Sequence, residues 1–263
     1  MSELASLVLD QCADPSTVDV FLHGFGGEAA QWRPLFKAMP DIGARLIAYD
    51  LPGHSGSLRY PDAGPPKVAA TAVLAEIEKL GRPVHIVGHS KGGAVASLCA
   101  LFRPDLVKSL VLLAPGGFGP RINGDLLARF AAVDDRVGLN AVLPEFYGPG
   151  YRVAASTRDR ILGMRARGGK GPGGQVDMLK HIRGIIVRDG GSQGELPLDK
   201  IAALGKPVRV VWGDEDNVLS VAQARALGDG FTVTILSGVG HTVYEEAPDA
   251  VIEAILANLA ETA

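Results

Sequence analysis

Short apolar runs recur along the chain and end at Gly, Asp or Pro. Val and Ile are frequent in them and polar alternation is weak, which is typical of parallel strands buried on both faces. The pattern predicts strands at Val18–Leu22, Arg45–Tyr49, Val84–Val87, Ser109–Leu113, Val208–Trp212 and Thr232–Leu236. It predicts helices at Ala70–Leu80, Ala94–Leu101 and Pro248–Leu259. Strands that alternate with helices predict an α/β fold, a mostly parallel central sheet with helices on both faces.

This alternation stops between about Phe118 and Glu195, where the pattern is helical and a glycine-rich segment spans Gly168–Gly174. Because the strands resume afterwards, the stretch is predicted to be an insertion that leaves the sheet and returns to it. We therefore expect a first core segment at 1–117, a helical cap at 118–195 and a second core segment at 196–263.

The predicted cap is basic. Between Arg121 and Asp189 there are twelve Lys or Arg and seven Asp or Glu, a balance of +5 in a chain of net charge −3, which leaves −8 for the rest. Arg158 and Arg165 are seven residues apart, as are Arg160 and Arg167, so each pair returns to nearly the same helix face. Two interpretations remain open: a solvated surface, or a positively charged roof that favours acidic acyl groups.

Composition excludes several classes of protein. The sequence is 47% apolar and 21% charged, as in a globular protein, and its small negative charge does not favour nucleic-acid binding. No apolar stretch is long enough to span a membrane, and the N-terminus lacks the features of a signal peptide, so we expect a cytoplasmic protein. Cys12 and Cys99 form no disulfide or metal motif, and we expect neither metal nor cofactor.

The strongest chemical signal is Gly88-His89-Ser90-Lys91-Gly92, a match to G-x-S-x-G between a predicted strand and a helix. Such a turn raises the serine hydroxyl above the carboxyl edge of the sheet, where open α/β folds bind ligands. A Cβ two positions to either side would collide with neighbouring backbone, which explains the two glycines. Ser90 is therefore the predicted nucleophile.

A serine nucleophile needs a base and an acid that orients it. His241 follows the last predicted strand and lies at the same sheet edge, so it is the best candidate for the base. The remaining histidines are expected to be structural or exposed: His23, His54, His85, His89 and His181. Asp214 and Asp216 both precede His241, in the chain order Ser…Asp…His expected of this fold. We favour Asp216, because Asp214 lies in the turn itself and suits local backbone hydrogen bonds.

The oxyanion of an acyl-transfer intermediate needs hydrogen-bond donors. A glycine-rich loop, His23-Gly24-Phe25-Gly26-Gly27, follows the first strong strand, and we expect the backbone amides of Phe25 and Lys91 to supply these donors. The residues expected to contact substrate are Gly24, Gly26, Gly117 and Phe118.

Five segments in this order and spacing resemble the α/β-hydrolase superfamily: HGFGG, DLPGHSGS, GHSKGG, WGDEDNV and GVGH. The resemblance covers nearly the whole chain. Within it, LLAPGGFGPRING resembles the hydrolase portion associated with acetoin dehydrogenase acyltransferase components, and APGGFGP more weakly resembles carbon–carbon hydrolases of meta-cleavage products. Three features depart from the usual pattern. Lys91 replaces the common Met or Gln, Thr242 stands where the carbon–carbon hydrolases usually have Trp, and the short N-terminus predicts a reduced or missing first strand or two.

These residues together predict a serine hydrolase that cleaves a small-molecule carboxylic ester through an acyl-enzyme at Ser90. One alternative is hydrolysis of a carbon–carbon bond in a β-diketone-like acid, although Thr242 counts against it. The other is a ligand receptor built on the same fold, against which the intact Ser, Asp and His argue. We expect no nucleic-acid or membrane partner, and the sequence leaves the oligomeric state open.

Overall fold

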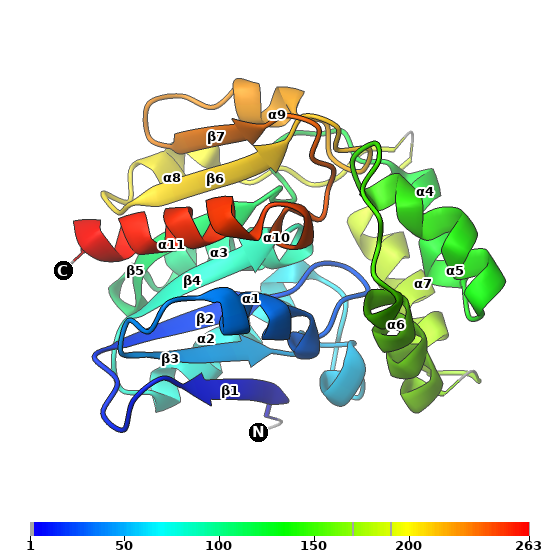
Figure 1. Cartoon of the computed structure of the whole chain (residues 1–263), viewed down its shortest axis with the longest axis horizontal. Helices are drawn as coiled ribbons and strands as arrows, with labels where there is room; N and C mark the ends of the chain where they lie inside the picture. The colour runs from blue at the N-terminus through cyan, green and yellow to red at the C-terminus, as the bar shows by residue number, and fades with distance from the viewer. Residues whose placement is uncertain (1–2, 170, 190, 263) are drawn as a thin grey trace.

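The computed structural model describes residues 3–169, 171–189 and 191–262, and its centre is one seven-stranded sheet in the order β1-β3-β2-β4-β5-β6-β7 (Figure 1). The strands are β1 (Ser6–Asp10), β2 (Thr17–Leu22), β3 (Ala44–Tyr49), β4 (Val84–His89), β5 (Val107–Leu113), β6 (Val208–Gly213) and β7 (Thr232–Leu236). All neighbours pair in parallel except β1, which runs antiparallel to β3 with Ser6 opposite Tyr49. The six predicted strands are confirmed to within two residues at either end.

Strand β1 was not among the predicted strands. It lies at the edge of the sheet, and four of its five residues are exposed, so its sequence carries little of the burial signal that marks the inner strands. By contrast, every residue of β4 is buried. A reduced or missing first strand or two was expected at the N-terminus. The described residues contain one strand ahead of β2, and it is mostly exposed.

Helices cover both faces of the sheet. α1 (Arg33–Ala38) and α11 (Pro248–Glu261) lie in front of it in Figure 1, and α2 (Pro66–Lys79), α3 (Lys91–Phe102) and α8 (Leu198–Ala202) lie behind. The predicted helices correspond to α2, α3 and α11. α2 begins four residues earlier than predicted, with Pro66 in its first turn, where the missing proline N–H costs nothing. α3 begins directly after Ser90.

Four helices between β5 and β6 lie beyond the carboxyl ends of the strands, at the right of Figure 1. They are α4 (Gly124–Ala132), α5 (Arg136–Val142), α6 (Ala155–Gly168) and α7 (Gln175–Ile186), which with their loops we call the helical insertion. Two short helices, α9 (Ala222–Arg225) and α10 (Val243–Glu246), follow β6 and β7. No helix within the described residues is long and apolar enough to cross a membrane.

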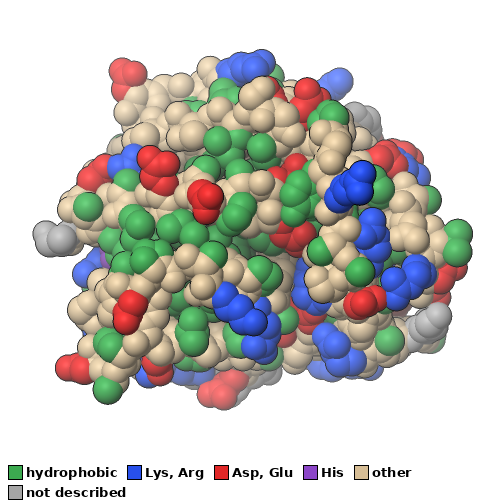
Figure 2. Space-filling view, viewed as in Figure 1, with side chains coloured by type: hydrophobic (Ala, Val, Ile, Leu, Met, Phe, Trp, Pro, Cys, Tyr) green, Lys and Arg blue, Asp and Glu red, His purple; other side chains and the backbone are tan. Residues whose placement is uncertain are grey.

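The arginines of the insertion are largely engaged with protein groups. Figure 2 shows basic side chains interspersed with acidic ones on this side of the molecule. Arg129 binds Glu145 at 2.6 Å and Arg136 binds Asp159 at 2.6 Å, both on the surface. Each such pair is solvent-exposed and stabilises little, and because its acid already counts in the +5 balance it leaves the net charge of the insertion unchanged.

The expectation that Arg158, Arg160, Arg165 and Arg167 form positive faces above Ser90 is wrong for Arg165. Arg165 is 2% exposed and lies inside the insertion. Its guanidinium donates to the Phe130 carbonyl oxygen at 2.7 Å and stands 4.6 Å from the centre of the Phe130 ring. Burial lowers the pKa of Arg165 to about 10. This arginine therefore ties α6 to α4 and does not face a ligand.

Candidate active site

Ser90 lies at the junction of β4 and α3 in a left-handed conformation, with φ of 52°. Few residues other than glycine adopt such a φ, and it is typical of strained functional turns. The Ser90 N–H donates to the Leu113 carbonyl at 2.9 Å, which holds the turn against β5. A Cβ on Gly88 would lie 2.4 Å from the Gly92 carbonyl oxygen, and one on Gly92 would lie 2.2 Å from that of Leu22. The predicted steric need for both glycines is confirmed.

His241 and Asp216 form a buried hydrogen bond, with 2.8 Å between Nδ1 and Oδ2. The other carboxylate oxygen of Asp216 accepts the N–H groups of Val218 and Leu219, each at 2.8 Å, so both oxygens of Asp216 are held. The carboxylate favours a proton on Nδ1, which leaves Nε2 as the free nitrogen of the ring. Within the described residues Ser90 Oγ and His241 Nε2 share no hydrogen bond, a contact that often aligns only when substrate binds.

Asp214 has a different role from Asp216. Its Oδ1 accepts the Gly238 N–H at 2.7 Å and so joins the loop after β6 to the loop after β7. The structure thus brings Asp216, and not Asp214, to His241.

The loop after β2 packs directly on the Ser90 turn. A Cβ on Gly24 would lie 2.8 Å from His89 Nδ1 and 3.1 Å from Ser90 Cβ, so only glycine allows this approach. The N–H groups of Gly26 and Gly27 are bound by His54 Nε2 and the Gly24 carbonyl. The Phe25 N–H has no hydrogen-bond partner among the described residues. Lys91 is the first residue of α3, where a helix leaves its N–H groups unpaired.

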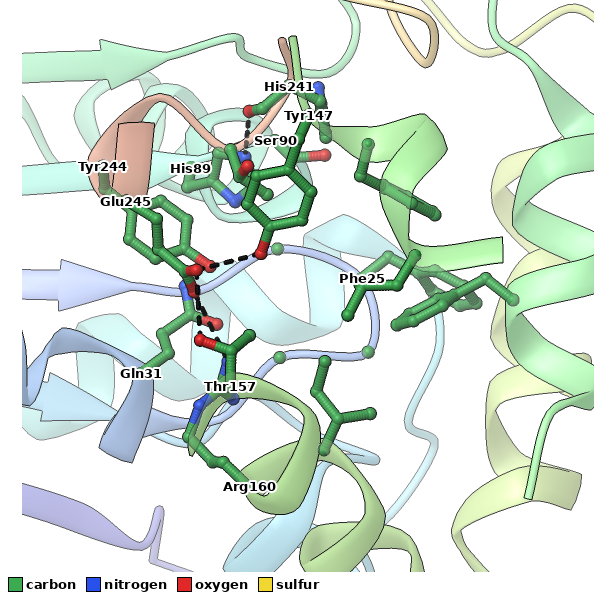
Figure 3. A pocket seen from close by; sticks show the side chains of 18 of the residues that line it. Phe25, Gln31, His89, Ser90, Tyr147, Thr157, Arg160, His241, Tyr244 and Glu245 are labelled. Carbon is green, nitrogen blue, oxygen red and sulfur yellow. Dashed lines mark hydrogen bonds and ion pairs between the residues drawn. The ribbon is translucent and has the colours of Figure 1, made fainter. Parts of the chain in front are cut away.

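A small cavity of about 50 Å³ lies on one side of Ser90 and is lined by Ser90, Phe25 and His241 (Figure 3). Its far wall is polar. Glu245 accepts hydrogen bonds from Tyr147 Oη at 2.9 Å and Thr157 Oγ1 at 3.2 Å. Arg160 lies 3.7 Å from Glu245 and 3.8 Å from Glu28. This wall was not predicted, apart from Arg160 as one of the cap arginines.

A larger cavity of about 440 Å³ lies on the other side of Ser90. Ser90 and Phe25 line both cavities, whereas His241 lines only the small one among the described residues. The larger cavity is lined by Lys91 and by apolar side chains that include Leu98, Ile122, Leu127, Ile186, Leu196 and Leu219. Three charged residues, Lys67, Arg188 and Glu195, also line it and are exposed.

The predicted substrate contacts divide between the two cavities. Gly24 and Gly26 line the small one, and Gly117 lines the larger one. The Phe118 side chain is 3% exposed and packs on Phe231 with ring centres 5.8 Å apart, away from both described cavities. Gln193 was not predicted, and it fixes this loop by accepting the Gly117 N–H at 3.1 Å and donating to the Gly119 carbonyl at 2.9 Å.

The other histidines have structural positions. Burial lowers the pKa of His23 to about 3 and also lowers that of His54, so both rings are neutral. His85 contacts Ser109 Oγ at 2.8 Å, and His89 Nε2 donates to the His241 carbonyl at 2.9 Å. His181 is exposed.

Cys12 and Cys99 are free thiols. Within the described ranges no group of three or more His, Cys, Asp or Glu is placed to hold a metal.

Comparison with known proteins places this geometry in a family. Residues 20–254 match the Alpha/beta hydrolase family. The chain belongs to that family. This α/β hydrolase is 32% identical over 231 residues to the dihydrolipoyllysine-residue acetyltransferase component of the acetoin cleaving system of Cupriavidus necator, covering 84% of this chain and 58% of that protein. The chain therefore spans a little over half the length of this relative. The predicted resemblance to that component is confirmed.

One further similarity supports a hydrolase, and another supports the fold. The monoacylglycerol lipase ABHD6 of Rattus norvegicus is 26% identical over 252 residues, covering 87% of this chain and 71% of the lipase. The meta-cleavage product hydrolase of Pseudomonas fluorescens has a similar fold, with a TM-score of 0.80 over 99% of this chain and 96% of that one, at 19% identity. The α/β-hydrolase fold predicted from the sequence is thus confirmed, whereas the substrate is not fixed by these similarities.

Proposed function

We propose that this α/β hydrolase cleaves a small-molecule carboxylic ester through an acyl-enzyme at Ser90. The observation that carries the proposal is the buried Nδ1–Oδ2 hydrogen bond between His241 and Asp216, at a cavity that Ser90 also lines. A carboxylate on Nδ1 fixes the imidazole orientation and stabilises the imidazolium that forms when the base takes a proton.

The proposed reaction has two halves. Ser90 Oγ bonds to the acyl carbon while His241 Nε2 takes the hydroxyl proton, and the bond to the leaving alcohol oxygen then breaks as His241 returns that proton to it. In the second half a water gives a proton to His241 and its oxygen bonds to the acyl carbon. The acid is released when Ser90 Oγ leaves and regains the proton.

Two backbone amides are proposed to bind the oxyanion. The Phe25 N–H is unpaired among the described residues, and the Lys91 N–H opens a helix beside the nucleophile. Donors that are fixed before the reaction stabilise developing charge without reorganisation, and one such donor is worth about 10²–10³ in turnover. The two donor loops lie close together, since a Cβ on Gly24 would come within 3.1 Å of Ser90 Cβ.

The position of His241 orients the substrate. His241 must protonate the leaving alcohol, and it lines only the small cavity, so we place the alcohol there and the acyl group in the larger cavity. The small volume and the polar wall around Glu245 favour a compact, polar alcohol. The larger cavity, with its many apolar side chains, has room for a longer acyl group.

We propose that the helical insertion, residues 118–195, acts as a cap. It supplies Leu127, Thr157 and Arg160 to the small cavity and Ile122 and Ile186 to the larger one, so it covers both sides of Ser90. A roof of this kind excludes water from the reacting groups and strengthens the electrostatic interactions inside.

The proposal is tested by labelling and by turnover. A fluorophosphonate should label the purified protein, and Ser90→Ala should abolish the label. A panel of esters with varied acyl and alcohol groups, run beside one meta-cleavage product, should then show repeated turnover of an ester. Faster consumption of the carbon–carbon substrate would favour the alternative hydrolase. A label without repeated turnover of any substrate would favour a receptor.

A further inference from the structure

A buried lysine stands next to the nucleophile and has no hydrogen-bond partner. Lys91 is 5% exposed, and its Nζ is enclosed and unpaired among the described residues. Other atoms of the residue line the larger cavity beside Ser90, whereas Nζ itself is covered by protein. Buried polar groups are nearly always paired, so an unpaired ammonium at this position calls for a physical reason.

The neighbouring histidines cannot serve as its partners. The charge of Lys91 acts on His23 and His54, where it adds to the stronger effect of burial in lowering the pKa of each ring. His23 donates from Nδ1 to the Gly24 carbonyl at 2.7 Å and accepts the Leu51 N–H on Nε2 at 2.9 Å. His54 donates to the Pro52 carbonyl and accepts the Gly26 N–H, both at 3.2 Å. Every ring nitrogen is occupied, so neither ring has an acceptor left for the ammonium.

This arrangement is costly in the empty protein. An ammonium loses its hydration on burial and here gains no protein acceptor in return. Burial accordingly lowers the pKa of Lys91 to about 8, which leaves the amine mostly protonated at pH 7. A methionine would fill similar space without that cost. The cost is offset only when an acceptor enters the cavity.

The rest of the larger cavity also favours an anion. Its lining carries three basic residues, Lys67, Lys91 and Arg188, and one acidic residue, Glu195. Lys67, Arg188 and Glu195 are exposed and therefore screened by water and salt, whereas Lys91 is enclosed. The specific contact is thus assigned to Lys91.

We propose that the Lys91 side chain turns toward the larger cavity and that its Nζ there binds a carboxylate carried by the acyl part of the substrate, so that the enzyme prefers half-esters of short dicarboxylic acids. The inference rests on the proposed function, because it needs the acyl group to lie on the Lys91 side of Ser90. Since Lys91 directly follows Ser90 in the chain, the carboxylate must lie only a few bonds from the reacting carbonyl. A glutaryl half-ester meets this requirement.

The test compares two esters of one alcohol. One is a glutarate half-ester, and the other is its glutaramate counterpart, in which a neutral amide replaces the carboxylate at equal size. The unmodified enzyme should show a kcat/KM ratio of at least about tenfold in favour of the carboxylate, as expected of one charged hydrogen bond. Lys91→Met should bring that ratio close to one. Lys37→Met, the same substitution at an exposed lysine on α1, should leave the ratio unchanged.

Two results would overturn the proposal. A Lys91→Met enzyme that keeps the kcat/KM ratio of the two esters within about twofold of the parent would show that Lys91 does not bind the carboxylate. An equal loss on both esters would place Lys91 at the oxyanion instead of at the acyl group.

A binding measurement separates this proposal from the proposed function and does not depend on how Lys91→Met folds. Calorimetry on Ser90→Ala should show glutarate binding at least about fivefold more tightly than glutaramate, and equal affinities would contradict the proposal. Failure of the proposed function would appear elsewhere, as absent fluorophosphonate labelling and absent turnover of both esters in the unmodified enzyme.

Discussion

The two cavities that meet at Ser90 differ in how a charged group of each is held. In the small cavity the Glu245 carboxylate accepts hydrogen bonds from Tyr147 and Thr157 and lies 3.7 Å from Arg160, so this charge has protein partners. In the larger cavity the enclosed amine of Lys91 has none among the described residues. A charge that is paired within the protein keeps its position and leaves selection to the size and polarity of the cavity. An unpaired charge instead selects by what it can bind, because the ligand supplies the missing partner.

The largest effect is expected at the proposed nucleophile, which lines both cavities. Ser90→Ala should lower turnover by roughly 10⁴–10⁶ for every ester, whichever cavity its distinctive group occupies, because the nucleophile itself is lost. Steady-state rates with each ester check this. Ser220→Ala, at an exposed serine that lines neither cavity, is the control. Turnover of Ser90→Ala within about tenfold of the parent would remove Ser90 from the mechanism.

The next largest effect is expected on the small-cavity side, where His241, the proposed base, lies. Asp216→Asn should reduce kcat by about 10³–10⁴, because the amide supports neither the required tautomer nor the imidazolium. Asp214→Asn is the matched control and should cost less than about tenfold, since Asp214 binds only the Gly238 N–H. Measured kcat values that rank the other way would make Asp214 the acid.

A double comparison of variants separates the two cavities. Arg160→Gln removes the cation between Glu28 and Glu245, and we expect about a tenfold loss of kcat/KM for esters of compact polar alcohols. The ratio of kcat/KM for the carboxylate-bearing ester to kcat/KM for its amide counterpart should stay unchanged in this variant. Arg136→Gln, at an arginine paired on the surface with Asp159, is the control. A change in the acyl ratio for Arg160→Gln would mean that the cavities do not act separately.

The smallest expected effect is a dependence on pH. The pKa of Lys91 is lowered by burial to about 8, so the amine is charged below that pH and becomes neutral above it. The carboxylate-to-amide ratio should therefore fall several-fold between about pH 7 and 9.5. Because both esters share the base, His241 cancels from the ratio.

The groups that face Lys91 do not reverse this sign. His23 and His54 pack beside it and stay neutral, because the pKa of each is lowered by burial. The other charged residues of the cavity are Lys67, Arg188 and Glu195 at its exposed lining. Lys91→Met should show no such fall, and the same fall in that variant would assign it to another group.

Much of the α/β core was predictable because its signals are local. Inner strands are buried on both faces and appear as short apolar runs, and the Ser90 turn is marked by glycines whose missing side chains its geometry requires. Strand β1 escaped prediction because it pairs on one side only and is mostly exposed. Asp216 was favoured over Asp214 because a residue in the turn itself suits hydrogen bonds to backbone, and Asp214 does bind a backbone N–H, that of Gly238 on the loop after β7.

The missed parts of the candidate site depend on contacts between distant segments. Tyr147, Thr157 and Glu245 come from three separate stretches, and no motif links them. Residue spacing could place Arg165 on a helix face but could not show that the face meets the Phe130 ring of another helix. Lys91 was noted as unusual, but its lack of a partner follows only from the hydrogen bonds of His23 and His54.

The helical insertion is joined to the core between two adjacent, paired strands, β5 and β6. About 90 residues separate the end of one strand from the start of the other, yet the entropy of closing such a loop grows only with the logarithm of its length, and doubling it costs about 0.6 kcal/mol. The insertion, which we propose to roof Ser90, can therefore lengthen, shorten or be exchanged in evolution at little cost to the sheet. In this architecture the range of substrates can change when the insertion between β5 and β6 is replaced, while the packing of the core stays the same.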